Sequence, residues 1–283
     1  MDTLRTVTSG EIADCVARLC IRACTVLPEQ VCQWVAAAEQ AEPFTPARET
    51  LALMRQNAAI AQRETVPICQ DTGMAVVFAD VGQDVHIVGD TLENAVNLGV
   101  SRGYTEGWLR KSVVRDPIRR GNTGDNTPAV LHTQLVGGSS LTLTVAPKGF
   151  GSENMSRLAM LTPAEGLEGV KAFVLETVRL AGANPCPPVI VGVGLGGDFE
   201  QVALLSKRAL VSLRSQPHPD PFYAALEAEL LAEINRTGIG PQGFGGLTTA
   251  LSVRIETAPT HIAGLPVAVN MGCHVTRHAS ETL

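Results

Sequence analysis

Three cysteines lie in short breaks between apolar segments, where a thiol can be presented to a ligand. Cys69 lies in PICQDTG, Cys186 in NPCPP, and Cys273 in NMGC at the end of an apolar run. The prolines around Cys186 stiffen its loop and remove backbone donors. The intervals are 117 (186 − 69) and 87 (273 − 186) residues, which cannot show that the thiols converge. Spacing alone leaves two alternatives open, a three-thiolate metal site or ordinary buried thiols.

The other four cysteines crowd the first helical patterns of the chain. They are Cys15, Cys20, Cys24 and Cys32. Their spacing matches no common metal motif, and free cysteine is among the most buried residue types. We therefore predict that these four thiols pack in the interior.

Composition excludes several classes of function. The chain has 22 basic and 28 acidic residues, a formal charge of −6, which argues against nucleic acid or an anionic membrane surface as a partner. No apolar run approaches the ~18 residues of a membrane span, and residues 1–15 lack an apolar signal core. Seven cysteines in a chain of 283 residues do not suggest a disulfide framework. We expect a soluble, cytoplasmic protein with reduced thiols.

The elements that must position these residues are predicted to be helices near the N-terminus, followed by alternating strands and helices. Helical periodicity predicts helices within 10–27, 28–42, 45–65, 91–109, 162–182, 198–211 and 222–238. Strand patterns occur at 74–82, 85–89, 187–197, 248–258 and 266–272. Residues 130–147 are predicted to form a hairpin around Gly137-Gly138. The pattern predicts an α+β fold with a helical segment, 1–65, packed on a cluster-binding catalytic domain, 66–283, together forming one structural domain.

Two other patterns suggest different chemistry. GVGLGG places glycines at 192, 194 and 197 between a strand and a helix, as in a dinucleotide-binding oxidoreductase. The acidic residue expected about 20 positions later is replaced by the loop SQPHPDP, residues 215–221. His274 and His278 have the spacing of a zinc helix but lack its glutamate, so a frayed polar terminus is predicted there.

Longer motifs carry a resemblance that covers residues 66–277. They are PICQDTG, LRKS, NTGDNTPAV, APKGFGSENMSRLAML, NPCPPVIVGVGLGG, GIGPQGFGGLTTA and PTHIAGLPVAVNMGC. Together they resemble the α subunit of the class I iron–sulfur fumarate hydratase and tartrate dehydratase family. The resemblance implies a hydro-lyase of the tricarboxylic acid cycle type and a [4Fe–4S] cluster held by Cys69, Cys186 and Cys273. One iron without a cysteine would serve as a Lewis acid for the substrate and make the enzyme sensitive to oxygen.

The resemblance also implies roles for six further residues. Asp71 and His261 would handle the proton. Gln70, Arg110, Lys148 and the backbone of Gly151 would bind the dicarboxylate substrate. Asp71 has a plain alternative as a turn cap, because aspartate suits tight turns.

A separate β subunit is implied because single-chain members of the family continue into a second domain. That domain contributes more of the charged groups that grip a dicarboxylate. We therefore expect an α–α dimer within a heterotetramer. The stretch from Lys148 to Asn154, KGFGSEN, favours fumarate and (S)-malate over L-tartrate or another 2-hydroxy dicarboxylate within this resemblance.

Overall fold

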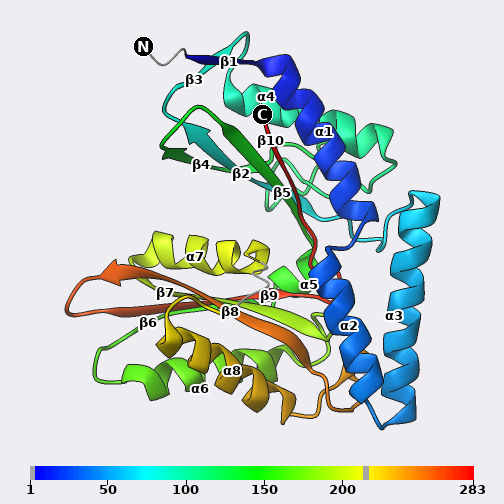
Figure 1. Ribbon diagram of the computed structural model, residues 1–283, viewed down its shortest axis with the longest axis vertical. Helices are drawn as coiled ribbons and strands as arrows, with labels where there is room; N and C mark the ends of the chain where they lie inside the picture. The colour runs from blue at the N-terminus through cyan, green and yellow to red at the C-terminus, as the bar shows by residue number, and fades with distance from the viewer. Residues whose placement is uncertain (1–3, 213–216) are drawn as a thin grey trace. The chain divides into compact units, whose positions relative to one another are not determined.

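The computed structural model describes residues 4–212 and 217–283 (Figure 1). The first two residues of the loop SQPHPDP lie outside these ranges. The chain divides into two compact units, and neither is one continuous stretch. The first unit comprises residues 1–28, 58–150 and 277–283, and the second comprises 29–57 and 151–276. No helix in the described ranges is long and apolar enough to cross a membrane.

The first unit is built on a four-stranded sheet in the order β10-β5-β2-β4. Its strands are β2 (Met74–Gly82), β4 (Val130–Val136), β5 (Leu141–Lys148) and β10 (Ala279–Thr282). β2 is parallel to β4 and antiparallel to β5, and β10 is antiparallel to β5. A second, parallel pair joins β1 (Arg5–Thr8) to β3 (Val85–Val88).

Two helices, α1 (Ser9–Thr25) and α4 (Leu92–Glu106), pack together against this sheet. Thr8 and Glu11 form a capping box at the start of α1. The helices approach closely because α4 has glycines at the crossing. A Cβ at Gly99 would lie 2.6 Å from the Ala13 carbonyl oxygen. The core beneath them combines alternate residues of β2 and β5 with apolar residues of both helices.

The hairpin predicted for residues 130–147 is wrong in its pairing, although both strands form. β2 lies between β4 and β5 in the sheet. The connection, residues 137–140, crosses the end of β2 and binds it there, with the Gly82 N–H donating to the Ser140 carbonyl at 2.9 Å. A Cβ at Gly82 would overlap the Gly138 carbonyl, so the missing side chain makes this crossing possible.

The second unit contains a four-stranded sheet in the order β6-β9-β7-β8. Its strands are β6 (Arg157–Leu161), β7 (Val189–Gly197), β8 (Ala250–Thr260) and β9 (Leu265–Gly272). β7 is parallel to β8 and antiparallel to β9. Helix α7 (Phe199–Val211) covers one face, and α6 (Gly166–Ala181) and α8 (Pro221–Asn235) cover the other (Figure 1).

The remaining helical elements are α2 (Glu29–Ala41), α3 (Thr45–Glu64), the four-residue α5 (Phe150–Glu153) and a 3-10 turn, Pro241–Gly243. α2 lies in the second unit and contacts β8 there. The division of α3 between the units falls after residue 57.

The GVGLGG stretch is the end of β7, and its glycines serve packing. Val189, Val191 and Val193 point into the core formed with α6 and α8. A Cβ at Gly192 would overlap the Ser206 carbonyl of α7. The carboxylate of Asp198 caps α7 by accepting the N–H groups of its first turn. A negative charge already occupies the helix terminus that would bind a pyrophosphate.

The α+β fold class is confirmed, although the short strand β1 precedes the helices that were predicted to come first. The frayed terminus predicted at His274 and His278 is wrong for the residues that follow, because 279–282 form β10 on the edge of β5. Burial lowers the pKa of His278. The boundary predicted between residues 65 and 66 stays a prediction.

Candidate functional site

The PICQDTG segment forms a turn before β2 in which polar groups bind one another. The Cys69 thiol accepts the Asp71 N–H at 3.4 Å and donates to the Gln70 side-chain oxygen at 3.3 Å. The Asp71 carboxylate accepts two backbone N–H groups, from Gly73 at 3.0 Å and from Phe150 at 2.9 Å. The carboxylate thus caps the turn and binds it to the KGFG segment, while the thiol lies beside an amide.

Arg110 is tied to this turn through its backbone. Its carbonyl accepts the Thr72 hydroxyl at 2.9 Å, and its side chain is exposed. Asn126 is fully buried, accepts the Ser112 N–H at 2.7 Å and donates to the Gly73 carbonyl at 3.2 Å. The LRKS and NTGDNTP motifs are therefore fastened to PICQDTG within the first unit.

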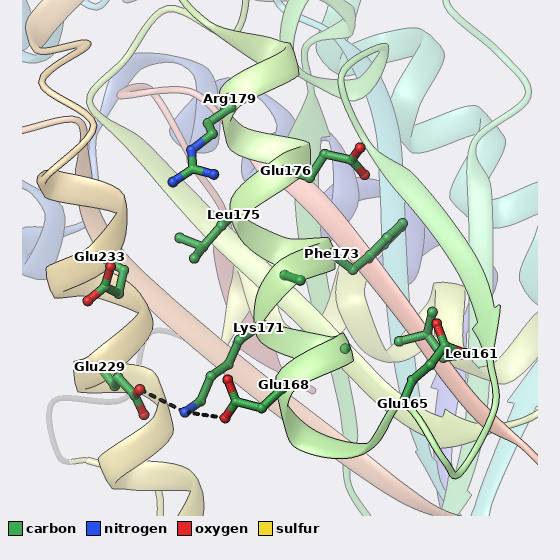
Figure 2. A pocket seen from close by; sticks show the side chains of 12 residues that line it. Leu161, Glu165, Glu168, Lys171, Phe173, Leu175, Glu176, Arg179, Glu229 and Glu233 are labelled. Atoms are coloured by element: carbon green, nitrogen blue, oxygen red, sulfur yellow. Dashed lines mark hydrogen bonds and ion pairs between the residues drawn. The ribbon is translucent and has the colours of Figure 1, made fainter.

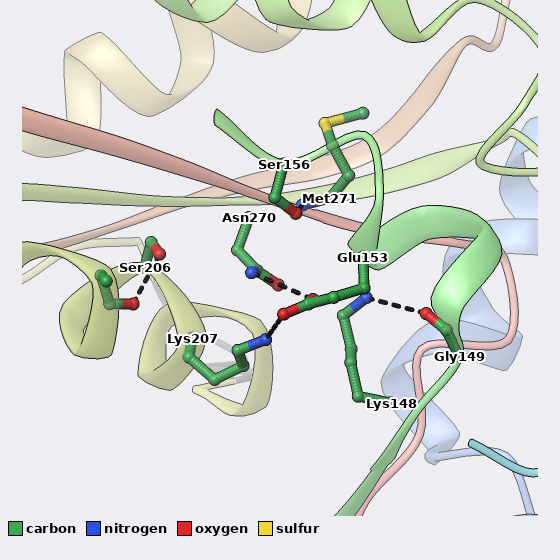
Figure 3. Close-up of polar contacts among 9 residues, drawn as sticks. Lys148, Gly149, Glu153, Ser156, Ser206, Lys207, Asn270 and Met271 are labelled. Carbon is green, nitrogen blue, oxygen red and sulfur yellow. Dashed lines mark hydrogen bonds and ion pairs between the residues drawn. The ribbon is translucent and has the colours of Figure 1, made fainter. Parts of the chain in front are cut away.

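Lys148 lies at the end of β5, opposite Met74 of β2. Gly73 has φ +73°, and a Cβ there would lie 2.6 Å from the Lys148 backbone, so this approach requires glycine. The Lys148 ammonium donates to the Gly149 carbonyl at 3.3 Å (Figure 3). The first unit thus gathers five of the predicted site residues around one turn, namely Cys69, Gln70, Asp71, Arg110 and Lys148.

Two buried side chains that the sequence did not single out support the same turn. Arg277 is 4% exposed and donates to the Asp71 carbonyl. Tyr104 donates its hydroxyl to the Thr72 carbonyl at 2.8 Å, and burial raises its pKa well above the ordinary value. Arg277 therefore brings a positive charge to the turn that carries Cys69. Tyr104 lies within residues 91–109, which were predicted to be helical, and nothing in the sequence indicated its contact with this turn.

In the second unit, Cys186 and Cys273 lie at one end of the sheet. Cys186 precedes β7 and Cys273 follows β9, and Ile190 of β7 pairs with Gly272 of β9. The His274 N–H donates to the Cys186 carbonyl at 3.3 Å, which joins the two loops directly. Cys186 is exposed and has φ +55°, a strained backbone conformation for a residue with a side chain.

Gln242 in the GIGPQGFGG segment fastens the same loops. Its backbone N–H and its side-chain amide both donate to the Pro187 carbonyl, at 2.7 and 2.9 Å. Its side-chain nitrogen lies 3.4 Å from His274 Nδ1, which lies 3.0 Å from the Cys186 carbonyl oxygen. Sequence reasoning missed Gln242 and His274 as supports of the cysteine loops. The available signal was the density of glycines on both sides of Gln242.

Gly151 and His261 lie at different places in the second unit. A Cβ at Gly151 would be 3.7 Å from the Asn184 carbonyl, so this glycine adjoins the loop of Cys186. His261 is exposed in the turn between β8 and β9, at the opposite end of the sheet (Figure 1). The eight residues of β9 separate it from Cys273, roughly 25 Å at the rise of a strand. Within this unit the structure brings Gly151, but not His261, toward the two cysteines.

Two cavities lie elsewhere in the second unit. One of about 810 Å³ lies between α6 and α8 and contains none of the predicted site residues (Figure 2). Its Lys171 binds Glu168 at 3.1 Å and Glu229 at 2.7 Å. The other, of about 450 Å³, is bordered by His261 and by mainly apolar side chains.

The four helical cysteines have surroundings of a different kind. Cys15, Cys20 and Cys24 are fully buried on α1, as predicted, and Cys32 on α2 is half-buried. Burial raises the pKa of Cys15 and of Cys24 to about 11, and that of Cys20 well above its ordinary value. These neutral thiols are poor metal ligands.

The three loop cysteines have the donor chemistry that an iron–sulfur cluster needs. Their thiols are soft ligands, they lie in loops, and each is exposed or half-buried. Among the residues in the described ranges, no three His, Cys, Asp or Glu side chains already form a metal-binding group. The assignment of Cys69, Cys186 and Cys273 to one cluster therefore stays a prediction.

Comparison with known proteins finds relatives that match this chain over nearly the whole of their own length. A protein of Methanocaldococcus jannaschii, provisionally named L(+)-tartrate dehydratase subunit alpha, is 39% identical over 96% of this chain and 98% of its own. The L(+)-tartrate dehydratase subunit alpha of Escherichia coli (strain K12) and that of Shigella sonnei are each 32% identical over 96% of this chain and 90% of their own.

The sequence profile of the fumarate hydratase (Fumerase) family matches residues 13–282. This range includes every motif that carried the resemblance. The chain therefore belongs to the fumarate hydratase (Fumerase) family of hydro-lyases.

Proposed function

We propose that this chain is the α subunit of an iron–sulfur hydro-lyase that interconverts fumarate and (S)-malate. The observation that supports this best is the turn at Cys69–Asp71, bound to the KGFG segment and to the backbone of Arg110. Three consecutive side chains there supply a thiol, an amide and a carboxylate. One short turn could thus join metal binding to the handling of substrate and proton.

The proposed cofactor is a [4Fe–4S] cluster held by Cys69, Cys186 and Cys273. Cys186 and Cys273 lie at the same end of the sheet and are linked through His274, which supports a paired role for these two thiols. When bound, the cluster would supply a Lewis acid at the iron that no cysteine holds.

Substrate binding is proposed for residues around the turn and the KGFGSEN stretch. The planar guanidinium of Arg110 suits a carboxylate with two parallel hydrogen bonds. Lys148 adds positive charge, and the side-chain amide of Gln70 can orient a carboxylate or hydroxyl. The backbone N–H of Gly151 can approach the substrate closely because no side chain intervenes.

Hydration of fumarate adds hydroxide to one carbon and a proton to its neighbour, so it needs a positioned acid or base. We assign this to Asp71 and His261. Both Asp71 oxygens accept a backbone N–H, and each keeps a second lone pair. The carboxylate is thus held in place and can still accept a hydrogen bond from the substrate.

His261 would act on the cluster site of a second copy of this chain. Within its own unit, the length of β9, roughly 25 Å, separates it from Cys273. Its neighbour Ile262 is 91% exposed, which suits a residue covered by another subunit. This arrangement supports the expected α–α dimer.

A separate β subunit would complete the site, giving a heterotetramer. A dicarboxylate needs two charged grips, and Arg110 accounts for one of them. The relatives that match over nearly their whole length are named as α subunits, which supports a partner for this chain too.

L(+)-tartrate is the second candidate, because the curated relatives carry that name. Tartrate differs from malate by one more hydroxyl on the carbon that loses the proton. A site that hydrogen-bonds this hydroxyl would discriminate strongly against malate. The KGFGSEN stretch is what favours fumarate within the sequence.

The test is to reconstitute the α and β subunits anaerobically and compare kcat/KM for fumarate, (S)-malate and L(+)-tartrate. We expect iron and sulfide to be bound, and fumarate and malate to be preferred. A preference for tartrate would transfer the assignment to the second candidate. Absence of iron after reconstitution would overturn both. Full activity after prolonged aeration would also contradict an exposed cluster iron.

A further inference from the structure

A half-buried ion pair in the second unit joins α7 to the end of the KGFGSEN segment. The Lys207 ammonium contacts the Glu153 carboxylate, and the two side chains are 18% and 26% exposed. The other Glu153 oxygen accepts the Asn270 side-chain N–H at 3.2 Å (Figure 3). Asn270 is 6% exposed, and its oxygen has no hydrogen-bond partner in the part of the chain that the structure describes. We call these three residues the Lys207 cluster.

The Lys207 cluster adjoins two residues with proposed roles. Glu153 follows Gly151 by two positions in the same short helix, α5. Asn270 lies on β9, three positions before Cys273. The cluster therefore joins the segment proposed to bind substrate to the strand that ends at a proposed cluster ligand.

Two backbone contacts fasten the same segment to β9. The Met271 N–H donates to the Ser156 hydroxyl at 3.0 Å (Figure 3). Arg157 then begins β6, opposite Val269 of β9. Residues 151–156 are thus held from both ends, by the side chain of Glu153 and by the pairing of β6.

The glycines of β7 bring Lys207 within reach of Glu153. Gly192 lies opposite Asn270 in the sheet, and a Cβ at Gly192 would overlap the Ser206 carbonyl. Ser206 immediately precedes Lys207. The close packing of α7 on β7 at Ser206 therefore determines how near the Lys207 ammonium lies to the sheet. The GVGLGG glycines would thus affect the proposed site through the packing of α7, and this effect requires no bound nucleotide.

We infer that Lys207 is a positioning residue for the reaction of this family, an inference that rests on the proposed function. Through Glu153 and Asn270 it holds the Gly151 segment in place. It also neutralises a carboxylate two residues from the proposed contact with a doubly negative substrate. Without the ammonium, Glu153 loses its contact with α7, so the Gly151 segment is held less firmly and binds the dicarboxylate more weakly.

The experiment compares Lys207→Met, Lys207→Arg, Glu153→Gln and the double variant Lys207→Met/Glu153→Gln in the reconstituted holoenzyme. We expect Lys207→Met to raise the KM for fumarate roughly tenfold, with a smaller change in kcat. Lys207→Arg should restore much of that loss because it keeps a cation in contact with Glu153. The double variant should lose about as much as Lys207→Met alone, because both residues act through one contact. The electron paramagnetic resonance spectrum and iron content should stay unchanged.

Lys171→Met is the matched control, since Lys171 is also 18% exposed and is also paired with glutamates (Figure 2). Hydrogen exchange of residues 151–156 should quicken in Lys207→Met and stay unchanged in Lys171→Met. An unchanged KM in Lys207→Met, or fully additive losses in the double variant, would overturn the inference. Wild-type protein without hydratase activity would instead overturn the proposed function. In that case, unchanged hydrogen exchange of residues 151–156 in Lys207→Met would still reject the positioning role.

Discussion

The seven thiols of this chain differ in their surroundings far more than in their chemistry. Cys20 and Cys24 lie in the apolar interface of α1 and α4, where desolvation favours the neutral form. Cys69 lies in a polar turn, and Cys186 is exposed. Reactivity with an alkylating reagent requires thiolate and access, so the two groups should separate chemically.

We predict that cluster-free protein treated with iodoacetamide is labelled at Cys69, Cys186 and Cys273 and not at Cys20 or Cys24. Anaerobic reconstitution of the cluster should protect the three labelled sites. Mass spectrometry of the peptides measures both effects. Labelling of any of the three that persists at full extent in reconstituted protein would remove that cysteine from the ligand set.

Alkaline conditions should destabilise the first unit. Burial raises the pKa of Cys24 from 9.0 to about 11, so its stabilising contribution is complete below pH 9 and is lost as pH rises through about 11. A shift of this size corresponds to roughly 2–3 kcal/mol. The melting temperature should fall between pH 9 and pH 11, with a shallower fall in Cys24→Ala. Equal slopes in the two proteins would contradict this assignment.

Asp71→Asn should separate capping from catalysis. An amide nitrogen cannot accept a hydrogen bond, so one N–H, of Gly73 or of Phe150, loses its acceptor at a cost of about 1–2 kcal/mol. Activity should fall about 100-fold or more while iron content is retained. Asp198→Asn is the control, because asparagine caps a helix as well as aspartate. Near-normal activity of Asp71→Asn would leave Asp71 as a cap alone.

At the scale of residues, the motifs predicted the candidate site but not the residues that support it. Cys69, Asp71 and Arg110 stood in recognisable stretches. Arg277 and Gln242 act through hydrogen bonds to the carbonyls of Asp71 and Pro187, which a side-chain pattern does not record. Residues that bind backbone can be found only once the backbone is folded.

At the scale of elements, glycines set the distances between layers. Gly99 brings α4 against α1, Gly192 brings α7 against β7, and Gly82 lets a loop cross β2. Each position is in contact with backbone, which cannot move aside as a flexible side chain can. Close packing of this kind should be intolerant of one added methyl group.

Gly192→Ala should lower the free energy of unfolding by about 2–3 kcal/mol, because the new Cβ overlaps the Ser206 carbonyl. Gly137→Ala should change it by less than about 0.5 kcal/mol, since no described atom lies within 4 Å of its Cβ. Urea denaturation of both variants measures the difference. Similar stabilities would show that α7 can move away from β7 without cost.

Most of the longer elements were predictable, but their partners were not. The short strands β1 and β6 had no prediction from the sequence. Residues 74–82 form the strand that their apolar run predicted, with the same bounds. The neighbours of that strand are β4 and β5, which the sequence had paired with each other. Turn chemistry at Gly137-Gly138 favoured a hairpin, and the absence of a side chain at Gly82 allowed β2 to lie between them. β10 was missed because one alanine and three polar residues carry no strand signal of their own.

At the scale of the whole molecule, the proposed use of His261 by a second copy can be tested by complementation. Copies carrying His261→Ala and copies carrying Cys186→Ser should each be inactive. A mixed dimer should contain one site with both residues intact. With random pairing, the mixture should recover about a quarter of wild-type activity. No recovery in mixtures shown to exchange subunits would place His261 outside the reaction.

The order of the strands in the first sheet has a consequence for synthesis. Residues 279–282 pair with β5 and are translated after the entire second unit. The nascent chain therefore emerges with the β5 edge unpaired, and this edge stays open to other strands until residues 279–282 have been translated. The first unit can therefore complete its sheet only after the second unit has been translated. A chaperone that binds extended segments would find its target on β5, near the middle of this chain.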